Sequence, residues 1–430
     1  MERQRELKQL STVYMFHPYC EHKRWHHSIG VAGIVKYFLH AQSPETMVDP
    51  HHQYLLVAAA LLHDIGHPAW CHVGEVFCKL RGAPLAHDDL SAQLVEGARE
   101  YDEYFKKWEL SRARDVIDDR SDRKMIASLI KGNPAIPPHI SVKGRKRCLT
   151  KNEKDEIRKQ TTFMGNMIKG HADFDRADFL MRDSFLSSSL PGLIDVRRIA
   201  ENLGIVDTAT GTKILAYTNL NFAEAMMTAR ELLYPGLYLE ARNLVAEELL
   251  IRAFHRAFPE DMNVLDFWFS TDEDVMKSLD VASNKDKFVD RVCKLMRARQ
   301  TYDLVEEITL LDQRLDSQSI DNIRYLGSDE GRPRVLDIEK EVCDDVGIAE
   351  GDIVIGSWLW KKPKIAEAPL LMKERLTTVS RESKLLEVID TDRYINSRSR
   401  LIIGMYRKVK NRRKIVDKIL ENLREKTYIA

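Results

Sequence analysis

The segment from Leu61 to Pro68 constrains this chain more than any other stretch of its sequence. An apolar run over 54–62 predicts a buried helix, and it ends in the adjacent pair His63 and Asp64, after which Gly66 and Pro68 stop a helix. Neighbouring side chains on a helix diverge by about 100°, so a pair in mid-helix chelates poorly. At a helix end, with ligands arriving from other helices, both can reach one ion. Imidazole and carboxylate ligands suit Mn, Fe, Ni, Zn or Mg.

The pattern of apolar residues predicts a mostly α-helical protein. Helical spacing with charged faces recurs through the first three-fifths of the chain, over 29–39, 54–62, 90–104, 176–185, 222–233 and 241–258. Strand-like residues appear later, at 351–360 and 401–406, before a helical tail at 411–426. We therefore expect a helical catalytic core over 1–330, with a long surface loop at 132–159, and a smaller C-terminal α+β subdomain over 331–430.

Charge and cysteine usage favour a cytoplasmic protein without a bulk electrostatic partner. Lys plus Arg and Asp plus Glu both number 66, so any recognition by charge is local. The six cysteines show no CxxC spacing, which indicates reduced thiols. The polar start argues against a signal peptide, and no apolar run approaches the roughly 20 residues that span a bilayer, so no membrane partner is expected. The basic run Lys143, Arg145, Lys146 and Arg147 predicts a solvated loop, with weak nucleic-acid binding as the alternative.

Histidines near acidic residues extend the candidate metal site beyond the His63–Asp64 pair. His27 lies upstream in a segment that predicts another helix, and Asp175 lies far downstream in an acidic helical segment. A lone His–Asp pair is more often a surface or capping pair. Here the pair follows a buried helix, where polar groups need partners. His26 is the alternative to His27 as a ligand.

The order H…HD…D formed by these residues resembles the pattern of the HD superfamily. Four further segments narrow the resemblance: QRELKQL, HKRWHHSIGV, HDIGHPAWCH and DFDRADFLMRD. They are similar to segments of the HD-domain deoxynucleoside triphosphate (dNTP) triphosphohydrolases, the group with bacterial dGTPases and the animal SAM-and-HD enzyme. The resemblance covers roughly residues 3 to 255.

This resemblance implies metal-dependent hydrolysis of dNTPs to a deoxynucleoside and inorganic triphosphate, by a homo-oligomer (dimer, tetramer or hexamer). The implied metal ligands are His27, His63, Asp64 and Asp175. The implied catalytic residues are His67, His72 and His87, with His87 as general acid or base and Glu75 or Asp88 as its acidic partner. The implied substrate contacts are Arg24 to a phosphate, Asp183 to the 3′-hydroxyl, Arg230 to the terminal phosphates, Tyr238 beside the sugar, and Arg176 and Phe179. Phe179 stands where the family usually has Tyr.

Two other function classes remain open at this point. One keeps the metal but acts as an HD-type phosphodiesterase, nucleotidase or 3′-exonuclease. The other is a binding module for nucleotides or single-stranded nucleic acid that lacks activity. Arg230, Tyr238 and Asp183 favour a triphosphate and sugar site over the first, and the intact ligand set argues against the second. No GxxxxGK[ST] loop is present, so a P-loop enzyme is excluded.

Overall fold

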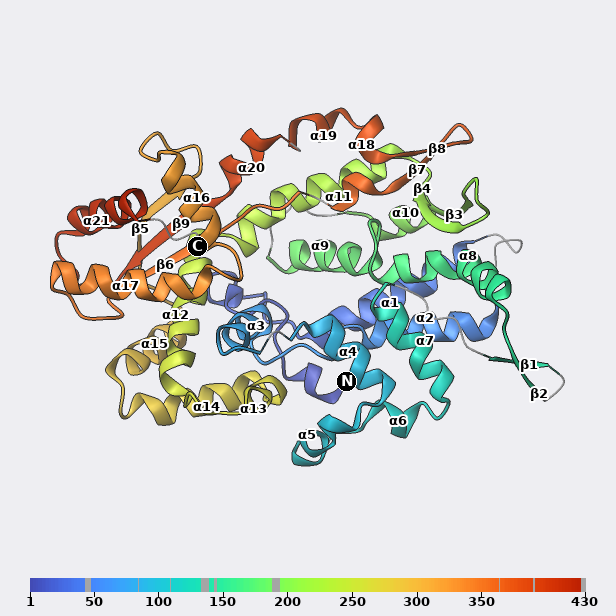
Figure 1. Ribbon diagram of the computed structural model, residues 1–430, viewed down its shortest axis with the longest axis horizontal. Helices are drawn as coiled ribbons and strands as arrows, with labels where there is room; N and C mark the ends of the chain where they lie inside the picture. The colour runs from blue at the N-terminus through green and yellow to red at the C-terminus, as the bar shows by residue number, and fades with distance from the viewer. Residues whose placement is uncertain are drawn as a thin grey trace.

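The computed structural model describes residues 1–42, 48–83, 85–108, 110–132, 139–142, 145–187, 194–362, 364–389 and 391–426. The chain is mostly helical, with three small sheets, as the sequence predicted (Figure 1). Among the described residues, no helix is both long and apolar enough to cross a bilayer.

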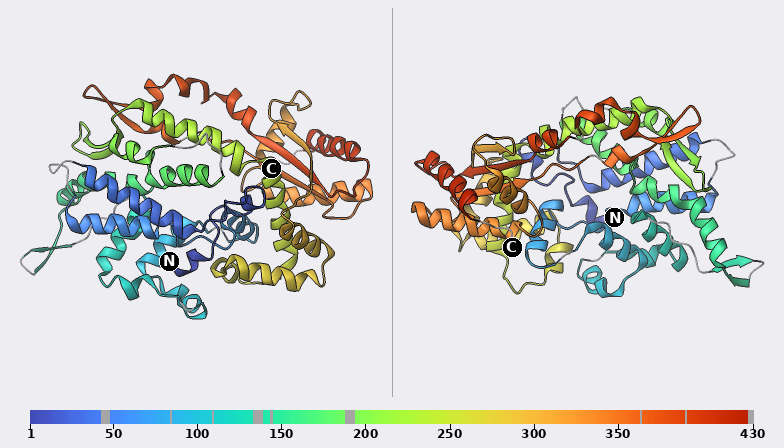
Figure 2. Two further views of the ribbon diagram at one scale, coloured as in Figure 1. Left: turned by 180° about the vertical axis from the view of Figure 1, so that it is seen from behind. Right: turned by 45° about the horizontal axis from the view of Figure 1, so that its top comes forward.

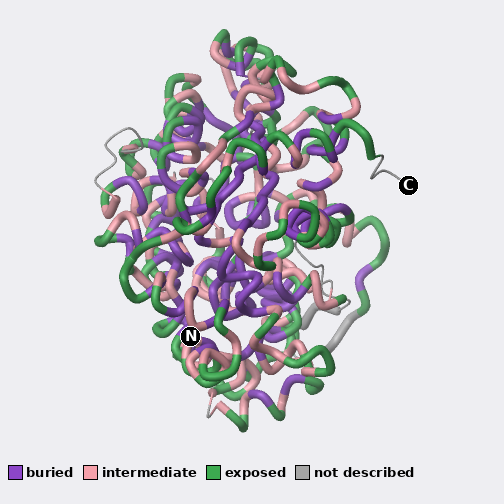
Figure 3. Tube along the Cα trace, turned by 90° about the vertical axis from the view of Figure 1, so that its left-hand side faces the viewer, coloured by how far each residue is buried: buried purple, intermediate pink, exposed green. Residues whose placement is uncertain are grey.

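Five helices form the layer that carries most of the polar site. They are α1 (Arg24–Ala41), α2 (Pro50–Leu62), α4 (His87–Glu96), α7 (Arg120–Ile130) and α9 (Phe174–Ser187). Helix α1 packs between α2 and α9, and α7 packs on α2 and α4. Phe38, Leu56, Ile126 and Phe174 are fully buried in the core between them. Figure 3 shows buried segments gathered in the interior of the molecule, with exposed segments mostly at its periphery.

The start and end of helix α2 determine where His63 and Asp64 lie. Asp49 caps its first turn by accepting the backbone N–H groups of His51 and His52, and Pro50 occupies the first helical position. The helix then buries four small or branched apolar residues and ends at Leu62. The predicted helix over 54–62 is therefore confirmed, and His63 and Asp64 stand at its C-terminal end, next to the core.

A second core forms around α12 (Ala241–Ala257), which lies across α3 (Cys71–Leu80), α14 (Asp272–Ser283) and α15 (Lys287–Arg297). Aromatic side chains dominate it. Phe77 lies 4.7 Å from the Phe267 ring and 5.5 Å from the Phe254 ring, between ring centres. Trp70 and Trp268 are buried in the same cluster. This packing fixes the segment that follows His63 and Asp64 against the second half of the chain.

The predicted C-terminal strands and helical tail are confirmed. An antiparallel sheet has the order β5 (Asp303–Thr309), β9 (Arg400–Met405), β6 (Ile353–Trp358). Helices α16 (Ser317–Leu326), α17 (Arg332–Val346) and α21 (Arg412–Glu425) pack beside it, at the left of Figure 1. Strand β5 precedes residue 330 and β9 follows it, so this sheet crosses the boundary predicted between the two domains.

A four-stranded sheet was not predicted. Its order is β3 (Leu203–Asp207), β4 (Lys213–Tyr217), β7 (Pro369–Met372), β8 (Arg375–Thr378). Strands β4 and β7 pair in parallel, with Tyr217 opposite Leu370. Strands β3 and β4 form a local antiparallel hairpin in a segment rich in β-branched residues, whereas the pairing of β4 with β7 joins residues far apart in the sequence.

The predicted loop over 132–159 is wrong in its second half. Helix α8 (Lys151–Ile168) begins there, because Thr150 and Glu153 form a capping box that starts it. Strands β1 (His139–Val142) and β2 (Arg145–Cys148) make an antiparallel hairpin before it, and the hairpin projects from the body in both views of Figure 2. The side chains of the basic run at 143–147 lie outside the described residues.

The remaining elements are short or connect these layers. They are η1 (Glu2–Arg5), η2 (Val13–Met15), η4 (Arg99–Tyr101), α5 (Asp102–Lys107), α6 (Ala113–Val116), α10 (Val196–Glu201), α11 (Leu220–Leu233), η6 (Tyr234–Tyr238), α13 (Val264–Phe269), η7 (Lys364–Glu367), α18 (Val379–Glu382), α19 (Lys384–Ile389) and α20 (Asp392–Arg398).

Candidate active site

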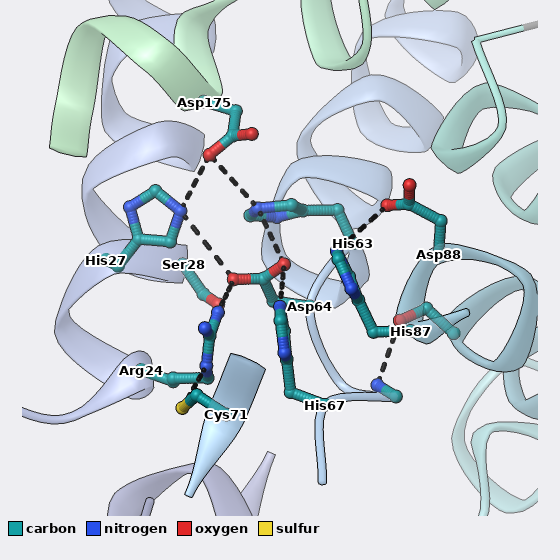
Figure 4. A network of polar contacts seen from close by, with 12 residues as sticks. Arg24, His27, Ser28, His63, Asp64, His67, Cys71, His87, Asp88 and Asp175 are labelled. Carbon is teal, nitrogen blue, oxygen red and sulfur yellow. Dashed lines mark hydrogen bonds and ion pairs between the residues drawn. The ribbon is translucent and has the colours of Figure 1, made fainter. Parts of the chain in front are cut away.

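Four side chains from three helices meet at one point, and we call them the metal cluster: His27, His63, Asp64 and Asp175 (Figure 4). His27 Nε2 lies 2.9 Å from Asp175 Oδ1 and 3.7 Å from Asp64 Oδ2. His63 Nε2 lies 3.4 Å from Asp64 Oδ1 and 3.7 Å from Asp175 Oδ1. The first turn of α1, the end of α2 and the first turn of α9 thus bring all four predicted ligands together.

Hydrogen bonds outside the metal cluster orient both of its imidazoles. His27 Nδ1 donates to Asp178 Oδ2 at 2.8 Å, and His63 Nδ1 donates to the carbonyl of Ala60 at 2.8 Å. Both Nε2 lone pairs therefore face the centre of the cluster, which is the arrangement that metal-binding histidines use. A Cβ at Gly30 would overlap Asp178, so glycine is needed for this approach. His26 instead is exposed and accepts the N–H of Lys23 at 3.1 Å.

The charges in the metal cluster suit a divalent cation. Burial opposes protonation of His27, yet Asp175 and Asp178 raise its pKa to about 10. The pKa of Asp64 lies well below its ordinary value, because His63, Arg24 and His67 outweigh its burial. His63 Nε2 has no hydrogen-bond partner among the described residues. The negative potential that retains a proton on His27 also attracts a metal ion, so these donors fit the Mn, Fe, Ni, Zn or Mg expected from their chemistry.

A second group, the histidine cluster, adjoins the metal cluster and consists of His67, His72, His87 and Glu75. The rings of His67 and His87 stack with their centres 3.7 Å apart. Glu75 accepts a hydrogen bond from Nδ1 of His87 at 2.7 Å and of His72 at 2.9 Å. His67 Nε2 lies 3.4 Å from Asp64 Oδ1, which connects the two clusters. Asp88 Oδ1 lies 3.4 Å from His87 Nε2, and its other oxygen pairs with Lys169.

The two stacked imidazoles differ in their protonation. Burial, Arg24 and His87 hold the pKa of His67 well below its ordinary value, so His67 is neutral. Burial opposes the charge on His87 as well, but Glu75 raises the pKa of His87 above its ordinary value. Environments that separate two pKa values in this way commonly divide the roles of acid and base. His87 can therefore act as a proton donor at neutral pH.

The loop over 66–70 is held by side chains from four distant segments. Arg3 in η1 donates to the carbonyl of His67, with Nη1 at 2.7 Å. The Trp268 indole donates to the carbonyl of Gly66 at 2.7 Å, and Asp272 accepts the N–H of Trp70 at 2.7 Å. Ser91 Oγ accepts the N–H of Gly66 at 2.8 Å, at an approach that a Cβ on Gly66 would block. These bonds fix the backbone from which His67 projects.

A cavity of about 320 Å³ opens beside both clusters. Its lining includes Arg24, His72, Phe179, Asp183 and Tyr238. Arg24 Nη1 also donates to Asp64 Oδ2 at 2.5 Å, so one guanidinium joins the cavity to the metal cluster. Tyr238 donates to Asp183 Oδ2 at 2.5 Å, and His22 Nε2 lies 2.9 Å from Asp183 Oδ1. Five residues predicted for substrate and catalysis thus share one cavity.

Arg230 and Arg176 lie near the cavity but are not among the described residues that line it. Arg230 pairs with Glu231 and stacks on Tyr234 and Trp360, whose ring centres lie 4.5 and 5.0 Å from its guanidinium carbon. Arg176 donates to the carbonyl of His171 at 3.2 Å. Arg230 lies in the last turn of α11, and Tyr238 is the last residue of the π-helical turn η6 that follows it. The two side chains are therefore not related by regular α-helical spacing.

Sequence patterns missed several residues that complete the site. Asp178 lies one turn after Asp175, so helical spacing could have placed it beside His27. Gln9 lines the cavity with its buried Oε1 lacking a partner among the described residues. Arg3, His22 and Glu247 also reach the site; His22 begins the HKRWHHSIGV segment but was not singled out, and Glu247 lies outside the four segments that carry the resemblance.

Comparison with protein families identifies both halves of the chain. Residues 24–159 match the HD domain, and residues 194–427, more than half of the chain, match the HD associated region. An uncharacterized protein of Mycoplasma genitalium is 27% identical over 286 residues, covering 65% of this chain and 59% of that protein. A Dictyostelium discoideum homolog of the deoxynucleoside triphosphate triphosphohydrolase SAMHD1 is 25% identical over 217 residues, covering 48% of this chain and 35% of that protein.

Solved structures share the fold. The crystal structure of a phosphohydrolase from Bacteroides thetaiotaomicron superposes with a TM-score of 0.64 at 18% identity, covering 95% of this chain and 93% of the other. A hypothetical protein from Aquifex aeolicus gives the same TM-score at 16% identity, covering 98% and 92%. The likeness therefore extends through both halves of the molecule.

Proposed function

This chain belongs to the HD-domain superfamily, and from that premise we propose that it hydrolyses dNTPs to a deoxynucleoside and inorganic triphosphate. The observation that carries the proposal is the shared cavity. Arg24, Asp183 and Tyr238 line it, and Arg24 binds Asp64 of the metal cluster directly. A phosphate-binding cation, a sugar-binding carboxylate and a candidate metal site are thereby within reach of one ligand.

The proposed reaction divides among residues with distinct charges. Water adds to the α-phosphorus, and the bond from that phosphorus to the sugar 5′-oxygen breaks. His27, His63, Asp64 and Asp175 would hold a divalent ion, which would supply a Lewis acid beside the phosphoryl group. Arg24 stabilises negative charge on the phosphates, because a guanidinium matches phosphate oxygens with two parallel donors. Its ion pair with Asp64 holds it beside the metal cluster.

The histidine cluster provides the proton that the leaving group needs. Glu75 holds His87 by its Nδ1 and raises the pKa of His87, so the cationic ring donates a proton to the departing 5′-oxygen. His72 shares the same carboxylate and lines the cavity, with its side chain 69% exposed. His67 remains neutral between His87 and Asp64, with its Nε2 3.4 Å from Asp64 Oδ1, and adds no charge to the site.

The sugar end of the proposed substrate lies at Asp183 and Tyr238. Asp183 accepts from the 3′-hydroxyl, and Tyr238 occupies the space that a 2′-hydroxyl requires. Phe179 contributes an apolar wall, its ring centre 6.2 Å from that of Tyr238. Arg230 and Arg176 are proposed to contact the terminal phosphates from outside the cavity wall. A divalent ion (Mn, Mg, Fe, Ni or Zn), a homo-oligomeric assembly and a cytoplasmic location complete the proposal.

Product analysis tests the proposal directly. Purified protein with Mn²⁺ or Mg²⁺ is incubated with each dNTP, singly and mixed, and the products are separated. We expect deoxynucleoside and inorganic triphosphate in equal amounts, both lost in Asp64→Ala. Release of monophosphate and pyrophosphate, or cleavage of oligonucleotides and cyclic dinucleotides alone, would contradict it and favour an HD-type phosphodiesterase, nucleotidase or exonuclease.

A further inference from the structure

Ser11 has a backbone conformation that serine rarely adopts, and it lies in the wall of the cavity beside both clusters. Its φ is 43°, and the Val13 N–H donates to the carbonyl of Leu10 at 2.9 Å, which closes a tight turn around Ser11. A side chain in this left-handed region costs free energy that glycine avoids, so glycine is the residue expected there. Strain of this kind concentrates at sites where ligands bind.

The Ser11 side chain is also buried without a partner. Ser11 is 6% exposed, and its hydroxyl makes no hydrogen bond within the described part of the chain. Cys71 offers a contrast, because it lines the same cavity and also has a positive φ, of 52°. Its thiol, however, accepts from Arg24 Nε at 3.0 Å and donates to the carbonyl of Lys8 at 2.7 Å. A buried hydroxyl without a partner costs stability, and rotation about the Cα–Cβ bond can turn that of Ser11 toward a ligand in the cavity.

The surroundings of Ser11 indicate which part of a nucleotide it can contact. Thr12, the next residue, donates from Oγ1 to Asn243 Oδ1 at 2.7 Å and so joins the turn to the start of α12. The proposed function already assigns the phosphates and the sugar to other side chains, so the base is the remaining part of the ligand. Leu244 and Trp358 also line the cavity, and their apolar surfaces suit a flat ring.

We propose that the Ser11 hydroxyl forms a hydrogen bond with the base of the dNTP, and that the turn keeps its strained conformation because it presents this hydroxyl. This inference rests on the proposed dNTP triphosphohydrolase function, which supplies the nucleotide. A hydroxyl both donates and accepts, so it matches a polar atom of either kind on the edge of a base. The contact is made in the bound state and in the transition state alike, so its loss raises KM more than it lowers kcat.

The 5-triphosphate of 1,2-dideoxyribose, which lacks a base, isolates this contact. Its hydrolysis is compared with that of the dNTP that the protein cleaves fastest, in wild type, Ser11→Ala and Ser11→Gly. For the dNTP we expect kcat/KM to fall about threefold to tenfold in both variants, mainly through KM, which is the effect of one neutral hydrogen bond. For the triphosphate without a base we expect no change.

Two further measurements separate this contact from an effect on folding. Ser184 is also buried with an unpartnered hydroxyl, but it is not among the described residues that line the cavity, so Ser184→Ala is expected to leave KM unchanged. Ser11→Gly relieves the strained turn, so its melting temperature is expected to equal or exceed that of wild type while its KM rises. A lower melting temperature in Ser11→Gly would make Ser11 a structural residue and overturn the inference.

The outcomes also separate this inference from the proposed function. Hydrolysis of the dNTP with the same kcat/KM in wild type and Ser11→Ala overturns the role of Ser11 and leaves the activity standing, as does an equal loss with the triphosphate that lacks a base. Where no dNTP is hydrolysed, equilibrium binding of the same two triphosphates decides. Weaker binding of the dNTP alone in Ser11→Ala supports the base contact without the activity, and unchanged binding overturns it.

Discussion

The metal cluster differs in its charges from the part of the cavity wall formed by Asn243, Leu244, Glu247 and Trp358, which we call the far wall. In the metal cluster each charged group faces a group of opposite charge. Asp64, for example, lies beside Arg24, His63 and His67. At the far wall, Glu247 meets a neutral amide and apolar side chains. A bound cation would complete the metal cluster, whereas in the far wall burial and Glu248 raise the pKa of Glu247 to about 8.

This difference predicts different responses to mutation. Removing one group from the metal cluster unbalances charges that are buried together, which affects the ion, the phosphates and the proton donor at once. Changing the far wall alters which ligand fits without disturbing the reacting atoms. Under the proposed function, we expect changes in the first region to affect the reaction itself and changes in the second to affect the fit of the ligand.

Asp175→Ala tests the metal cluster most severely. Loss of a ligand that contacts both His27 and His63 is expected to remove the bound ion and lower kcat by at least about a thousandfold. Metal content by mass spectrometry and product release are measured on the same sample. A variant that retains one ion per chain and near-normal turnover would remove Asp175 from the ligand set.

His87→Ala separates proton donation from metal binding. We expect kcat to fall about a hundredfold to ten-thousandfold, with metal content unchanged. Glu75→Gln adds a test by pH. Because the Glu75 charge raises the pKa of His87, the wild-type ring stays cationic to higher pH, and its loss shifts the alkaline limb of the rate profile to lower pH. A limb that does not move would assign the donor to another group.

Asp178→Asn tests whether orientation alone matters in the metal cluster. The amide keeps a hydrogen bond to His27 Nδ1 but loses the negative charge, so metal affinity is expected to weaken about tenfold to a hundredfold. Titration with Mn²⁺ measures this change. Saturating Mn²⁺ restores the rate if the effect lies in affinity, and an unrestored rate would point to a direct catalytic role.

Arg3→Ala tests how much the fixed position of the loop over 66–70 contributes to turnover and to stability. The carbonyl of His67 loses its buried donors, which costs about 1–3 kcal/mol of folding free energy and shifts His67 relative to His87. We expect turnover to fall by about tenfold, with metal content retained. Added guanidinium ion recovers part of the rate if Arg3 acts by position. Loss of stability without loss of rate would make Arg3 purely structural.

Tyr238→Phe carries the smallest expected effect, because it changes one hydroxyl at the sugar. The hydrogen bond to Asp183 is lost while the ring remains, so kcat/KM for dNTPs falls by about threefold to tenfold. Under the proposed function, exclusion of ribonucleotides depends on the ring, so we expect this variant to preserve it. Tyr238→Ala is the matched test, and it is expected to admit ribonucleotides.

The same contrast explains how far the sequence can predict the site. His63 and Asp64 follow a helix whose length and ending residues are local, and the ligand types are dictated by the chemistry of the ion. Asp178 is one helical turn from a ligand and was within reach of pattern analysis. Glu247 carries no such signal, because it reaches the cavity only when α12 packs beside the N-terminal segment. Gln9 lies within the QRELKQL segment, but its residue type alone did not indicate a place in the cavity wall.

The fold, like the site, could be predicted from the sequence only in part. The helices over 54–62 and 241–258 are amphipathic or apolar over their whole length, so their periodicity predicts them. Helix α8 was missed although Thr150 and Glu153 form a capping box, a local signal that was readable. The hairpin of β3 and β4 is local and was missed, whereas the addition of β7 to it depends on the pairing of Tyr217 with Leu370, which no local pattern encodes.

The parallel pairing of β4 with β7 has a consequence for the newly made chain. At typical synthesis rates, the strand that holds Tyr217 leaves the ribosome roughly 10 to 30 seconds before the strand that holds Leu370. The hairpin of β3 and β4 therefore waits with one edge unpaired, and an open edge is a template for strands of other chains. Slow translation between the two strands lengthens that interval, so aggregation during synthesis should respond to codon usage in the intervening segment.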